Sequence, residues 1–218
     1  MRNPVKGKTE AGRRREERAW RTRQRIVDAA LPLFLHRGYT RTTVEAIAQE
    51  AQVAPATVYQ AFGTKQSILS AALERSLAWD DEPTAILQRQ WVQEAREEPD
   101  MRRRLRIIAE HTAEIAARTA PIKEVMRDAA ALEPAVRDLI EEDHRHRRRV
   151  QRALVAVIFG TSEYDPAIAD AAETYFMFCH SYNFYVAERR LGWTMTRWRE
   201  WLVQTLMAAL LPADPGAR

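Results

Sequence analysis

The spacing of apolar residues restricts this 218-residue chain to helical folds. Apolar residues recur every three or four positions from Ile26 into the last quarter of the chain. No segment alternates apolar and polar residues as a half-buried strand does. The longest uninterrupted apolar stretch, 153–159, is far shorter than the roughly 20 residues that cross a bilayer. We therefore expect an all-α fold without a membrane helix.

The N-terminal segment is polar and basic, and the first helix is expected after it. Residues 1–20 contain almost no apolar side chains, which predicts a disordered arm. The stripe over 26–34 then predicts an amphipathic helix that ends at Gly38, since glycine accepts the left-handed conformation of a helix end. Pro32 lies inside this helix and predicts either a slight kink or a later start.

Three further helices are expected close behind. Thr42 and Glu45 form a capping-box pattern before a short helix over 43–51. Pro55 suits the first turn of a third helix, and Thr64 can cap a fourth. The residues expected to face inward from the third and fourth helices are Val58, Phe62, Ile68, Leu69, Ala72 and Leu73.

The remaining sequence consists of longer helical patterns. Pro121 and Pro134 stand where a helix can begin, Gly192 closes a long helix, and Pro212 stops the last one. The expected helices cover 101–115, 122–132, 134–159, 166–192 and 194–212. We expect three parts in all: a basic arm (1–20), a domain of four helices (21–80, with a pair of short helices at about 43–62) and a C-terminal helical domain (81–218).

Positive charge is concentrated at the N-terminus. The net charge of the whole chain is +4, but the first 65 residues carry +7 and the rest −3. A basic segment joined to a slightly acidic domain suggests a polyanionic partner, while a merely solvated tail is the alternative. The single cysteine, Cys179, excludes an internal disulfide, and no secretory signal is recognisable, so we expect a cytoplasmic protein.

Two short helices joined at residues 52–54 form the pattern of a helix-turn-helix, whose second helix enters the major groove of DNA. With Val58 and Phe62 inward, three side chains of that helix face outward. Glutamine can pair with adenine, and alanine or threonine methyl groups can contact thymine. The outward residues are Ala56, Thr57 and Gln60, with Tyr59 and Lys65 placed to contact phosphate. Taken singly, each would be an ordinary residue of a helix surface.

Residues 25–73 together resemble the DNA-binding domain of the tetracycline-repressor (TetR) family of bacterial regulators. The matching positions are Ala29-Ala30, Leu33-Phe34, Gly38-Tyr39, Thr42-Thr43-Val44, Ile47-Ala48, Ala51, Val53, Thr57-Val58-Tyr59, Phe62 and Lys65. The resemblance implies contacts to double-stranded DNA from Thr42, Thr43, Pro55, Ala56, Thr57, Tyr59, Gln60 and Lys65.

Two positions depart from the family pattern. Gln52 stands where the family usually has glycine in the turn, so the turn either strains this residue or takes another path. Ala54 stands where a serine or threonine usually caps the recognition helix, which forgoes ~1 kcal/mol. Neither departure removes a DNA-facing group. Residues 13–18 of the basic arm are a further hypothesis for phosphate or minor-groove contacts.

The resemblance also implies that the C-terminal domain binds a small molecule and forms a homodimer through its last two helices. Apolar surface on those helices supports the dimer, and serving the monomer core is the alternative. The dimer candidates are Tyr185, Trp198, Trp201, Leu202, Thr205, Leu206 and Ala209. Aromatic and soft side chains suggest an apolar or aromatic effector, with candidates Trp91, Met126, Tyr175, Phe176, Phe178 and Tyr182.

Catalytic and metal-binding patterns are weak. His144 and His146 are two residues apart and so lie on different helix faces, and the other histidines stand alone. No phosphate-binding glycine loop or nucleophile motif is present. The charge-dense stretch 141–152 is explained by pairs four residues apart, with a second polyanion patch at 145–149 as the minority view. We expect no enzyme, no metal and no cofactor.

The sequence therefore predicts a ligand-responsive transcriptional regulator, most simply a repressor that binds a pseudopalindromic operator as a homodimer. An activator of the same family is one alternative. A small-molecule-binding helical protein without operator specificity is another, and the outward Thr57 and Gln60 argue against it. A helical enzyme is disfavoured because polar catalytic groups do not cluster.

Overall fold

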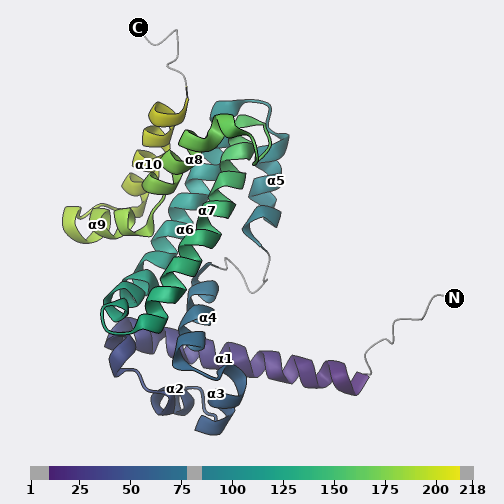
Figure 1. The fold of residues 1–218 in the computed structure, drawn as a ribbon, viewed down its shortest axis with the longest axis vertical. Coiled ribbons are helices and arrows are strands. Elements are labelled where there is room, and N and C mark those ends of the chain that lie inside the picture. The colour runs from purple at the N-terminus through teal and green to yellow at the C-terminus, as the bar shows by residue number, and fades with distance from the viewer. Residues whose placement is uncertain (1–9, 78–84, 212–218) are drawn as a thin grey trace, which may run out of the picture. The chain divides into compact units, whose positions relative to one another are not determined.

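The computed structural model describes residues 10–77 and 85–211, and all of its elements in these ranges are helices (Figure 1). The chain divides into two compact units at Arg75–Ser76, five residues before the boundary expected from the sequence. We call the described part of the first unit, residues 10–75, the head, and that of the second, residues 76–77 and 85–211, the body. No helix in these ranges is long and apolar enough to cross a membrane.

The head contains α1 (Glu10–Arg41), α2 (Val44–Glu50), α3 (Pro55–Phe62) and α4 (Lys65–Leu77), whose last two residues belong to the body. α1, α2 and α3 pack on one another, and their shared core includes Phe34 and Ile47, both fully buried. All six inward positions expected on α3 and α4 are buried: Val58, Phe62, Ile68, Leu69, Ala72 and Leu73. An ion pair between Arg75 and Asp28 (3.0 Å) connects α4 to α1.

The first helix is longer than expected. Residues 10–20, predicted to be a disordered arm, form the first three turns of α1, and residues 1–9 lie outside the described residues. Two ion pairs four residues apart, Glu10–Arg14 and Glu17–Arg21 (2.6 Å each), support this extension. The helix passes through Pro32, which is exposed, and its backbone departs from helical geometry only at Gly38 (φ +75°). Water can therefore hydrate the carbonyl that Pro32 leaves without a partner.

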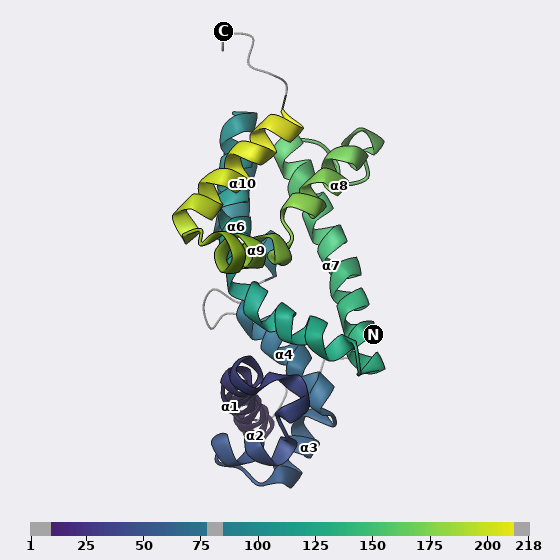
Figure 2. The same cartoon turned by 90° about the vertical axis from the view of Figure 1, so that its left-hand side faces the viewer.

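The body is built around one long central helix. α6 (Met101–Ala130) packs against α5 (Gln90–Glu97), α7 (Pro134–Phe159), α9 (Ser181–Leu191) and α10 (Met195–Leu210). α8 (Ala169–Phe178) lies along α7, as Figure 2 shows, and the short 3-10 helices η1 (Ile86–Gln88) and η2 (Pro166–Ile168) complete the body. Its core includes Trp198, Tyr175 and Ile108, which are almost entirely buried.

Two body helices differ from the sequence prediction. Pro121 does not begin a helix, because it lies on an exposed face of α6, which continues through it. The expected helix over 166–192 is divided at Cys179–His180 into α8 and α9. His180 caps α9 by accepting a hydrogen bond from the Tyr182 amide, and Asn183 donates to the last carbonyls of α8. These side-chain bonds replace the backbone bonds that a continuous helix would make. As expected, Gly192 ends α9, and the last helix begins at Thr194, which caps α10. Pro212 lies outside the described residues.

Candidate nucleic-acid interface and body cavities

Helix α2 is positioned by a threonine cap one residue later than expected. Thr43, not Thr42, is the N-cap, and its hydroxyl accepts a hydrogen bond from the Ala46 amide at 3.1 Å. The side chain of Thr43 is exposed, so it keeps its predicted place on the outer surface at the start of α2. An exposed cap of this kind leaves the first amides of α2 directed outward, where they attract anions.

Thr42 is not available for DNA, which corrects the prediction for this residue. Its side chain is fully buried, and its hydroxyl donates to the backbone carbonyls of Gly38 (2.8 Å) and Leu33 (3.2 Å). A hydroxyl enclosed in this way cannot reach a phosphate. Thr42 instead closes the end of α1 at the point where Gly38 interrupts the helix.

Helix α3 presents the predicted recognition residues on its outer face. Val58 and Phe62 are buried against the head, which orients the opposite side of the helix toward solvent. Pro55, Ala56 and Gln60 are exposed, Tyr59 is 50% exposed and Thr57 is partly exposed. The exposed face of α3 contains no acidic side chain that would repel phosphate. This arrangement leaves two side chains able to read base edges, Thr57 and Gln60.

The turn before α3 carries both departures noted in the sequence. Gln52 has φ +54°, the left-handed region in which glycine is favoured, and it is the only non-glycine residue with positive φ in the part of the chain that the structure describes. Ala54 provides no side-chain cap, and Pro55 occupies the first turn of α3. The turn thus follows the glycine-type path although its side chain disfavours it.

Two arginines of α1 stabilise this turn, a role that the sequence analysis missed. Arg25 donates to the carbonyls of Ala51 (2.6 Å) and Gln52 (3.2 Å), which are left without helical partners where α2 ends. Arg23 lies 4.1 Å from the centre of the Phe62 ring and donates to the carbonyl of Ala61. Arg23 and Arg25 therefore fix the helix-turn-helix to α1.

The start of α4 is held in place by Lys65 and Thr64. The Lys65 ammonium donates to the Tyr39 carbonyl at 3.0 Å and lies 4.1 Å from the centre of the Tyr39 ring. Thr64 caps α4, as expected, by accepting a hydrogen bond from the Ser67 amide at 3.1 Å. These contacts hold the Lys65 ammonium at the N-terminus of α4, and a cation at a helix N-terminus favours the binding of phosphate. Contact between Lys65 and phosphate stays a prediction.

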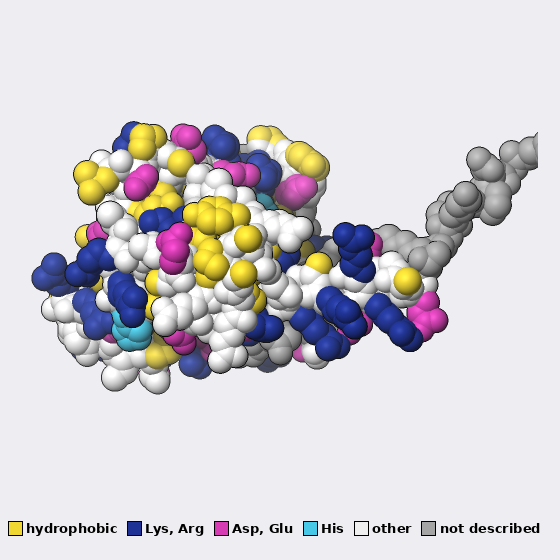
Figure 3. Space-filling view, turned by 90° about the horizontal axis from the view of Figure 1, so that it is seen from below, with side chains coloured by type: hydrophobic (Ala, Val, Ile, Leu, Met, Phe, Trp, Pro, Cys, Tyr) yellow, Lys and Arg dark blue, Asp and Glu magenta, His cyan; other side chains and the backbone are white. Residues whose placement is uncertain are grey.

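The N-terminal turns of α1 display a run of basic side chains. Figure 3 shows Lys and Arg side chains gathered along this part of the helix, next to the N-terminal residues drawn in grey. Arg13, Arg14, Arg15 and Arg18 are exposed there, and Arg14 pairs with Glu10. Exposed arginines on one rigid helix form a denser positive surface than the same residues on a disordered arm.

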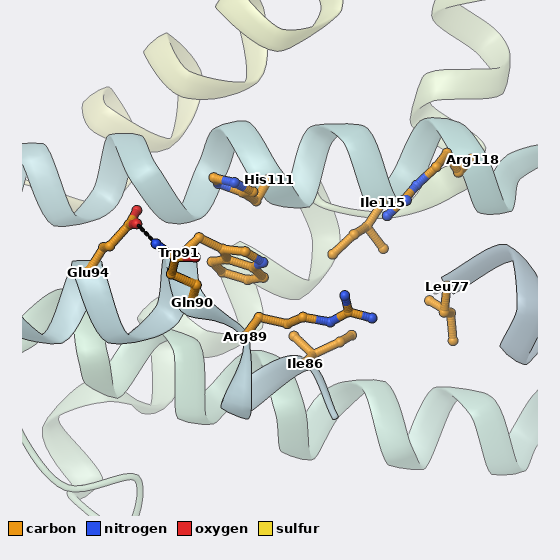
Figure 4. A pocket seen from close by; sticks show the side chains of 9 residues that line it. All are labelled: Leu77, Ile86, Arg89, Gln90, Trp91, Glu94, His111, Ile115 and Arg118. Carbon is orange, nitrogen blue, oxygen red and sulfur yellow. Dashed lines mark hydrogen bonds between the residues drawn. The ribbon is translucent and has the colours of Figure 1, made fainter. Parts of the chain in front are cut away.

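The body contains a partly open cavity of about 360 Å³ (Figure 4). Its volume lies in the range of small-molecule sites. One wall carries the indole of Trp91 stacked on the imidazole of His111, with ring centres 4.8 Å apart and planes 8° apart. His111 is oriented by a hydrogen bond from its Nδ1 to the Ile107 carbonyl (2.9 Å). The lining residues are Leu77, Ile86, Arg89, Gln90, Trp91, Glu94, His111, Ile115 and Arg118.

A smaller cavity of about 70 Å³ shares the walls Leu77, Ile86 and Ile115 with the first, and its lining is mostly apolar apart from a few charged and amide side chains. Lys123 and Asp143 form an ion pair across it (2.8 Å), and both side chains are largely buried. Burial lowers the pKa of Lys123, an effect that Asp143 opposes. The other residues that line it are Thr112, Ala116, Thr119, His146, Arg147, Val150, Gln151, Leu154, Cys179 and Ser181.

Of the six predicted ligand residues, Trp91 lines a cavity and the other five lie elsewhere. Met126 and Tyr175 are buried in the core, where the Tyr175 hydroxyl and the Thr112 hydroxyl are 2.6 Å apart. Phe176 lies under the guanidinium of Arg147 (4.2 Å). Phe178 packs on Trp201, and Tyr182 is 44% exposed. The sequence analysis missed the polar residues of both cavities, because they come from helices that are distant along the chain.

The seven predicted dimer residues divide into two groups. Trp198, Leu202 and Leu206 face the monomer core and are at most 1% exposed, which corrects their assignment to an interface. The Trp198 indole donates to the Ala113 carbonyl of α6 (3.2 Å), so its position is fixed within the chain. The residues that retain accessible surface are Tyr185, Trp201, Thr205 and Ala209.

The histidines are less isolated than the sequence suggested. His144 and His180 lie 5.8 Å apart in edge-to-face geometry, and Phe176 packs against both. Burial, followed by the charge of Arg147, lowers the pKa of His144 and lowers that of His180 to about 4. Within the described ranges, no three metal-ligating side chains cluster. Cys179 is buried, which raises the pKa of its thiol to about 12.

A short capped helix, a left-handed turn and a second helix with exposed Thr57 and Gln60 define a helix-turn-helix DNA-binding domain. Residues 26–72 match the family model described as "Bacterial regulatory proteins, tetR family". Residues 26–72 therefore form a DNA-binding domain of the tetR type.

The sequence similarity to individual relatives is confined to the head. The HTH-type transcriptional regulator SrpR of Pseudomonas putida is 38% identical over 73 residues, which cover 32% of this chain and 34% of SrpR. The curated relatives that the chain matches are covered over 24% to 54% of their lengths. The similarity in sequence therefore concerns the DNA-binding part of these proteins.

Similarity in fold extends over the body. FadR of Bacillus subtilis, whose structure holds stearoyl-CoA, matches with a TM-score of 0.63 and 16% identity over 86% of this chain and 98% of FadR. NalD, the secondary repressor of the MexAB-OprM multidrug efflux pump in Pseudomonas aeruginosa, matches with a TM-score of 0.63 and 18% identity over 90% of this chain and all of NalD. At such identities the comparison establishes the fold.

Proposed function

We propose that this chain is a homodimeric transcriptional repressor that binds a pseudopalindromic operator and is released by a small apolar or aromatic effector. The observation that carries the proposal is the outer face of α3, where Thr57 and Gln60 are accessible while Val58 and Phe62 fix the helix to the head. Gln60 can form a bidentate pair with adenine, and Thr57 can contact a thymine methyl group. Thr43, Tyr59 and Lys65 then contact the flanking phosphates and set the register.

A dimer supplies the second recognition helix. Two helix-turn-helix units read half-sites about one DNA turn apart, roughly 34 Å or a multiple of it, so a two-fold protein reads a two-fold site. Tyr185, Trp201, Thr205 and Ala209 retain surface for this contact. Exposed apolar side chains on α8 and α9, Met177 (69%) and Leu191 (58%), add to it. NalD, which shares the fold, is a repressor.

The body supplies the effector site. The 360 Å³ cavity offers the Trp91–His111 stack as an aromatic platform, which suits a planar or apolar molecule. Bound effector relieves repression if it binds the DNA-incompetent state more tightly than the DNA-bound state, since differential affinity alone can shift the equilibrium. An activator of the same family would use the same parts, and the position of the operator relative to the promoter distinguishes the two.

The exposed arginines at the start of α1 add affinity without sequence preference. Arg13, Arg14, Arg15 and Arg18 lie on one helix and can neutralise phosphates outside the half-site. Replacing these four residues with glutamine should flatten the dependence of log K on log salt by about 0.9 for each phosphate that is no longer neutralised. An unchanged slope would assign the binding to the helix-turn-helix alone.

The proposal is tested by footprinting the protein on the DNA upstream of its own gene, with its oligomeric state measured by sedimentation. We expect a dimer in solution and protection of two half-sites related by a two-fold axis. A monomer at operator-binding concentrations, or protection without two-fold symmetry, would contradict binding as a dimer. Protection that overlaps the promoter supports repression, and protection upstream of it supports the activator alternative.

A further inference from the structure

We infer that the effector is a carboxylic acid, whose carboxylate is bound by Arg147 in the smaller cavity while its aromatic or apolar part lies against Trp91 and His111 in the larger one. The inference rests on the proposed function, in which the body binds an effector, and it names the chemical class of that molecule. It changes the expectation of a purely apolar or aromatic ligand.

Arg147 carries the inference because one edge of its guanidinium has no partner. Its Nε and Nη2 are both buried and make no hydrogen bond in the described chain. These are the two adjacent N–H groups that bind a carboxylate side-on, through two parallel hydrogen bonds. Buried polar groups are nearly always paired in native proteins, so an unpaired donor edge in a cavity wall indicates an acceptor from outside.

The remaining surroundings of Arg147 hold the guanidinium without satisfying it. Its guanidinium carbon lies 4.2 Å from the centre of the Phe176 ring, a stacking contact that fixes the plane and uses no N–H group. Burial lowers its pKa, and an arginine in a protein stays protonated despite such a shift. The result is an oriented cation whose donor edge needs an anion.

The charges in the smaller cavity favour the same conclusion. Lys123 and Asp143 are paired with each other at 2.8 Å, so their charges compensate. Asp143 also raises the pKa of Arg147, so one carboxylate faces two cations, and the lining arginine, lysine and carboxylate side chains carry one positive charge in excess. An entering carboxylate would neutralise it in a largely dry site, where charge-assisted hydrogen bonds are strong.

Gln151 adds a second polar group on the same side of α7. It lies four residues after Arg147, which places both on one face of the helix, and both line the cavity. Gln151 is 5% exposed, and its Oε1 has no hydrogen-bond partner in the described chain. The Oε1 atom of Gln151 is an acceptor and would pair with a donor rather than with the carboxylate, so the carboxylate contact is assigned to Arg147, in a lining that is otherwise mostly apolar.

The sizes of the two cavities assign the two ends of the ligand. The smaller one, about 70 Å³, holds a group of a few atoms such as a carboxylate, whereas the larger one, about 360 Å³, holds a ring system. Leu77, Ile86 and Ile115 line both cavities, so the two are neighbours, and the inference requires an apolar segment of the ligand to cross at these side chains. The inferred ligand thus has a carboxylate group at one end, an apolar linker, and an aromatic or aliphatic group at the other end.

The test compares matched acids and amides by titration calorimetry on the full-length protein. The probes are 2-naphthoate, 2-naphthylacetate and 4-(2-naphthyl)butanoate, each paired with its primary amide, which has the same shape without the charge. For the acid of suitable length, we expect affinity about tenfold or more above that of its amide, as for a hydrogen bond to a charged group. If none of the three acids binds more tightly than its amide, the inference is wrong.

Variants identify the residue responsible. Arg147→Gln should abolish the preference for the acid, and Arg147→Lys, which keeps the charge but loses the two-pronged geometry, should retain only part of it. Arg148→Gln is the matched control, because Arg148 also lies over Phe176 (5.0 Å) but is exposed and does not line the cavity. An equal loss of preference in Arg148→Gln, or an unchanged preference in Arg147→Gln, would overturn the assignment.

Operator binding, measured on each variant preparation, separates this inference from the proposed function. If the protein binds the operator but shows no preference for an acid over its amide, the inferred ligand class is wrong and the proposed function as a DNA-binding regulator still holds. Loss of operator binding in the wild-type protein contradicts the proposed function itself. A folded Arg147→Lys variant, shown by an unchanged cooperative unfolding transition, keeps the test valid if Arg147→Gln is unstable.

Discussion

The head and the body of this chain differ in how far apart in the sequence their functional residues lie. The predicted DNA contacts that stay accessible occupy a single stretch from Thr43 to Lys65. The cavity residues of the body come from α5, α6, α7 and the segment after α8, so Trp91 and Ser181 are separated by most of the domain. A surface formed by one short helix can be deduced from local periodicity, but a cavity between helices depends on their packing.

The largest expected effect tests whether the first turn of α10 belongs to the body core. Trp198→Ala removes a side chain that is 1% exposed and the hydrogen bond from its indole to Ala113. We expect a loss of about 3–5 kcal/mol in the free energy of unfolding, as for large core truncations. Urea unfolding measures it, with Trp193→Ala, at a partly exposed position, as the milder control.

If Trp198→Ala left stability unchanged and instead separated the dimer into monomers, the residue would belong to an interface. The assignment from apolar spacing would then be right. Trp198, Leu202 and Leu206 show why spacing alone failed here: a stripe of large apolar residues predicts a buried face but does not distinguish burial within the chain from burial by a partner.

The next effect sharpens the description of the head. Thr42→Val preserves shape but removes the hydroxyl that donates to Gly38 and Leu33. We expect a loss of about 1–2 kcal/mol in stability, because two part-buried carbonyls lose the hydroxyl donor that they share. The preference for operator over scrambled DNA should not change. A selective loss of that preference with unchanged stability would restore Thr42 as a DNA contact.

A smaller effect concerns the left-handed turn. Gln52→Gly should raise the free energy of unfolding by about 0.5–1 kcal/mol, since relief of the left-handed conformation exceeds the added entropy of the unfolded chain. Gln52→Ala keeps the backbone penalty and serves as the control. Equal stability of all three proteins would show that the contacts of Arg25 to Ala51 and Gln52 already compensate for the strain.

A further effect is a pH dependence in the body. The pKa of His180 is about 4 in the folded chain, against 6.5 for the unperturbed side chain, with burial as the main cause. Between these pH values the unfolded chain binds a proton that the folded chain does not, so stability falls as the pH decreases through this window. His180→Asn keeps a cap acceptor for α9 and should lose less stability than the wild type between pH 6.5 and 4.

His146→Asn, at an exposed position, provides the control for this titration. Thermal unfolding at a series of pH values measures all three proteins. Parallel curves for the wild type and His180→Asn would show that His180 does not contribute to the pH dependence. The other groups that influence its pKa, Arg147, Lys123, His144 and Asp143, are unchanged in both.

The sequence predicted the head well where local rules decide. The inward residues of α3 and α4 and the cap at Thr64 follow from side-chain spacing and capping rules. For Gln52 the sequence left two backbone paths open, and the structure shows the left-handed one. The sequence analysis missed the helical extension over 10–20, because composition alone does not count ion pairs such as Glu17–Arg21. It also missed Arg25, whose contact partners are 26 and 27 residues away.

The body was predicted as a set of helices but not as a site. The sequence predicted Trp91 as a ligand-binding residue because it is aromatic. Its stacking partner His111 and the unpaired donors of Arg147 become apparent only once the helices are packed. The break between α8 and α9 was missed because it depends on hydrogen bonds made by His180 and Asn183 rather than on glycine or proline. Such bonds have no periodic signature in the sequence.

The most direct test of the central claim is the fluorescence anisotropy of the protein on the DNA upstream of its own gene and on a scrambled duplex, at two salt concentrations. The account predicts tighter binding to the native duplex at both concentrations, with a preference that falls by about 1–3 kcal/mol in Gln60→Ala or Thr57→Ala. Gln93→Ala, an exposed glutamine of the body, should leave it unchanged. Equal, steeply salt-dependent binding to both duplexes would contradict sequence reading by α3.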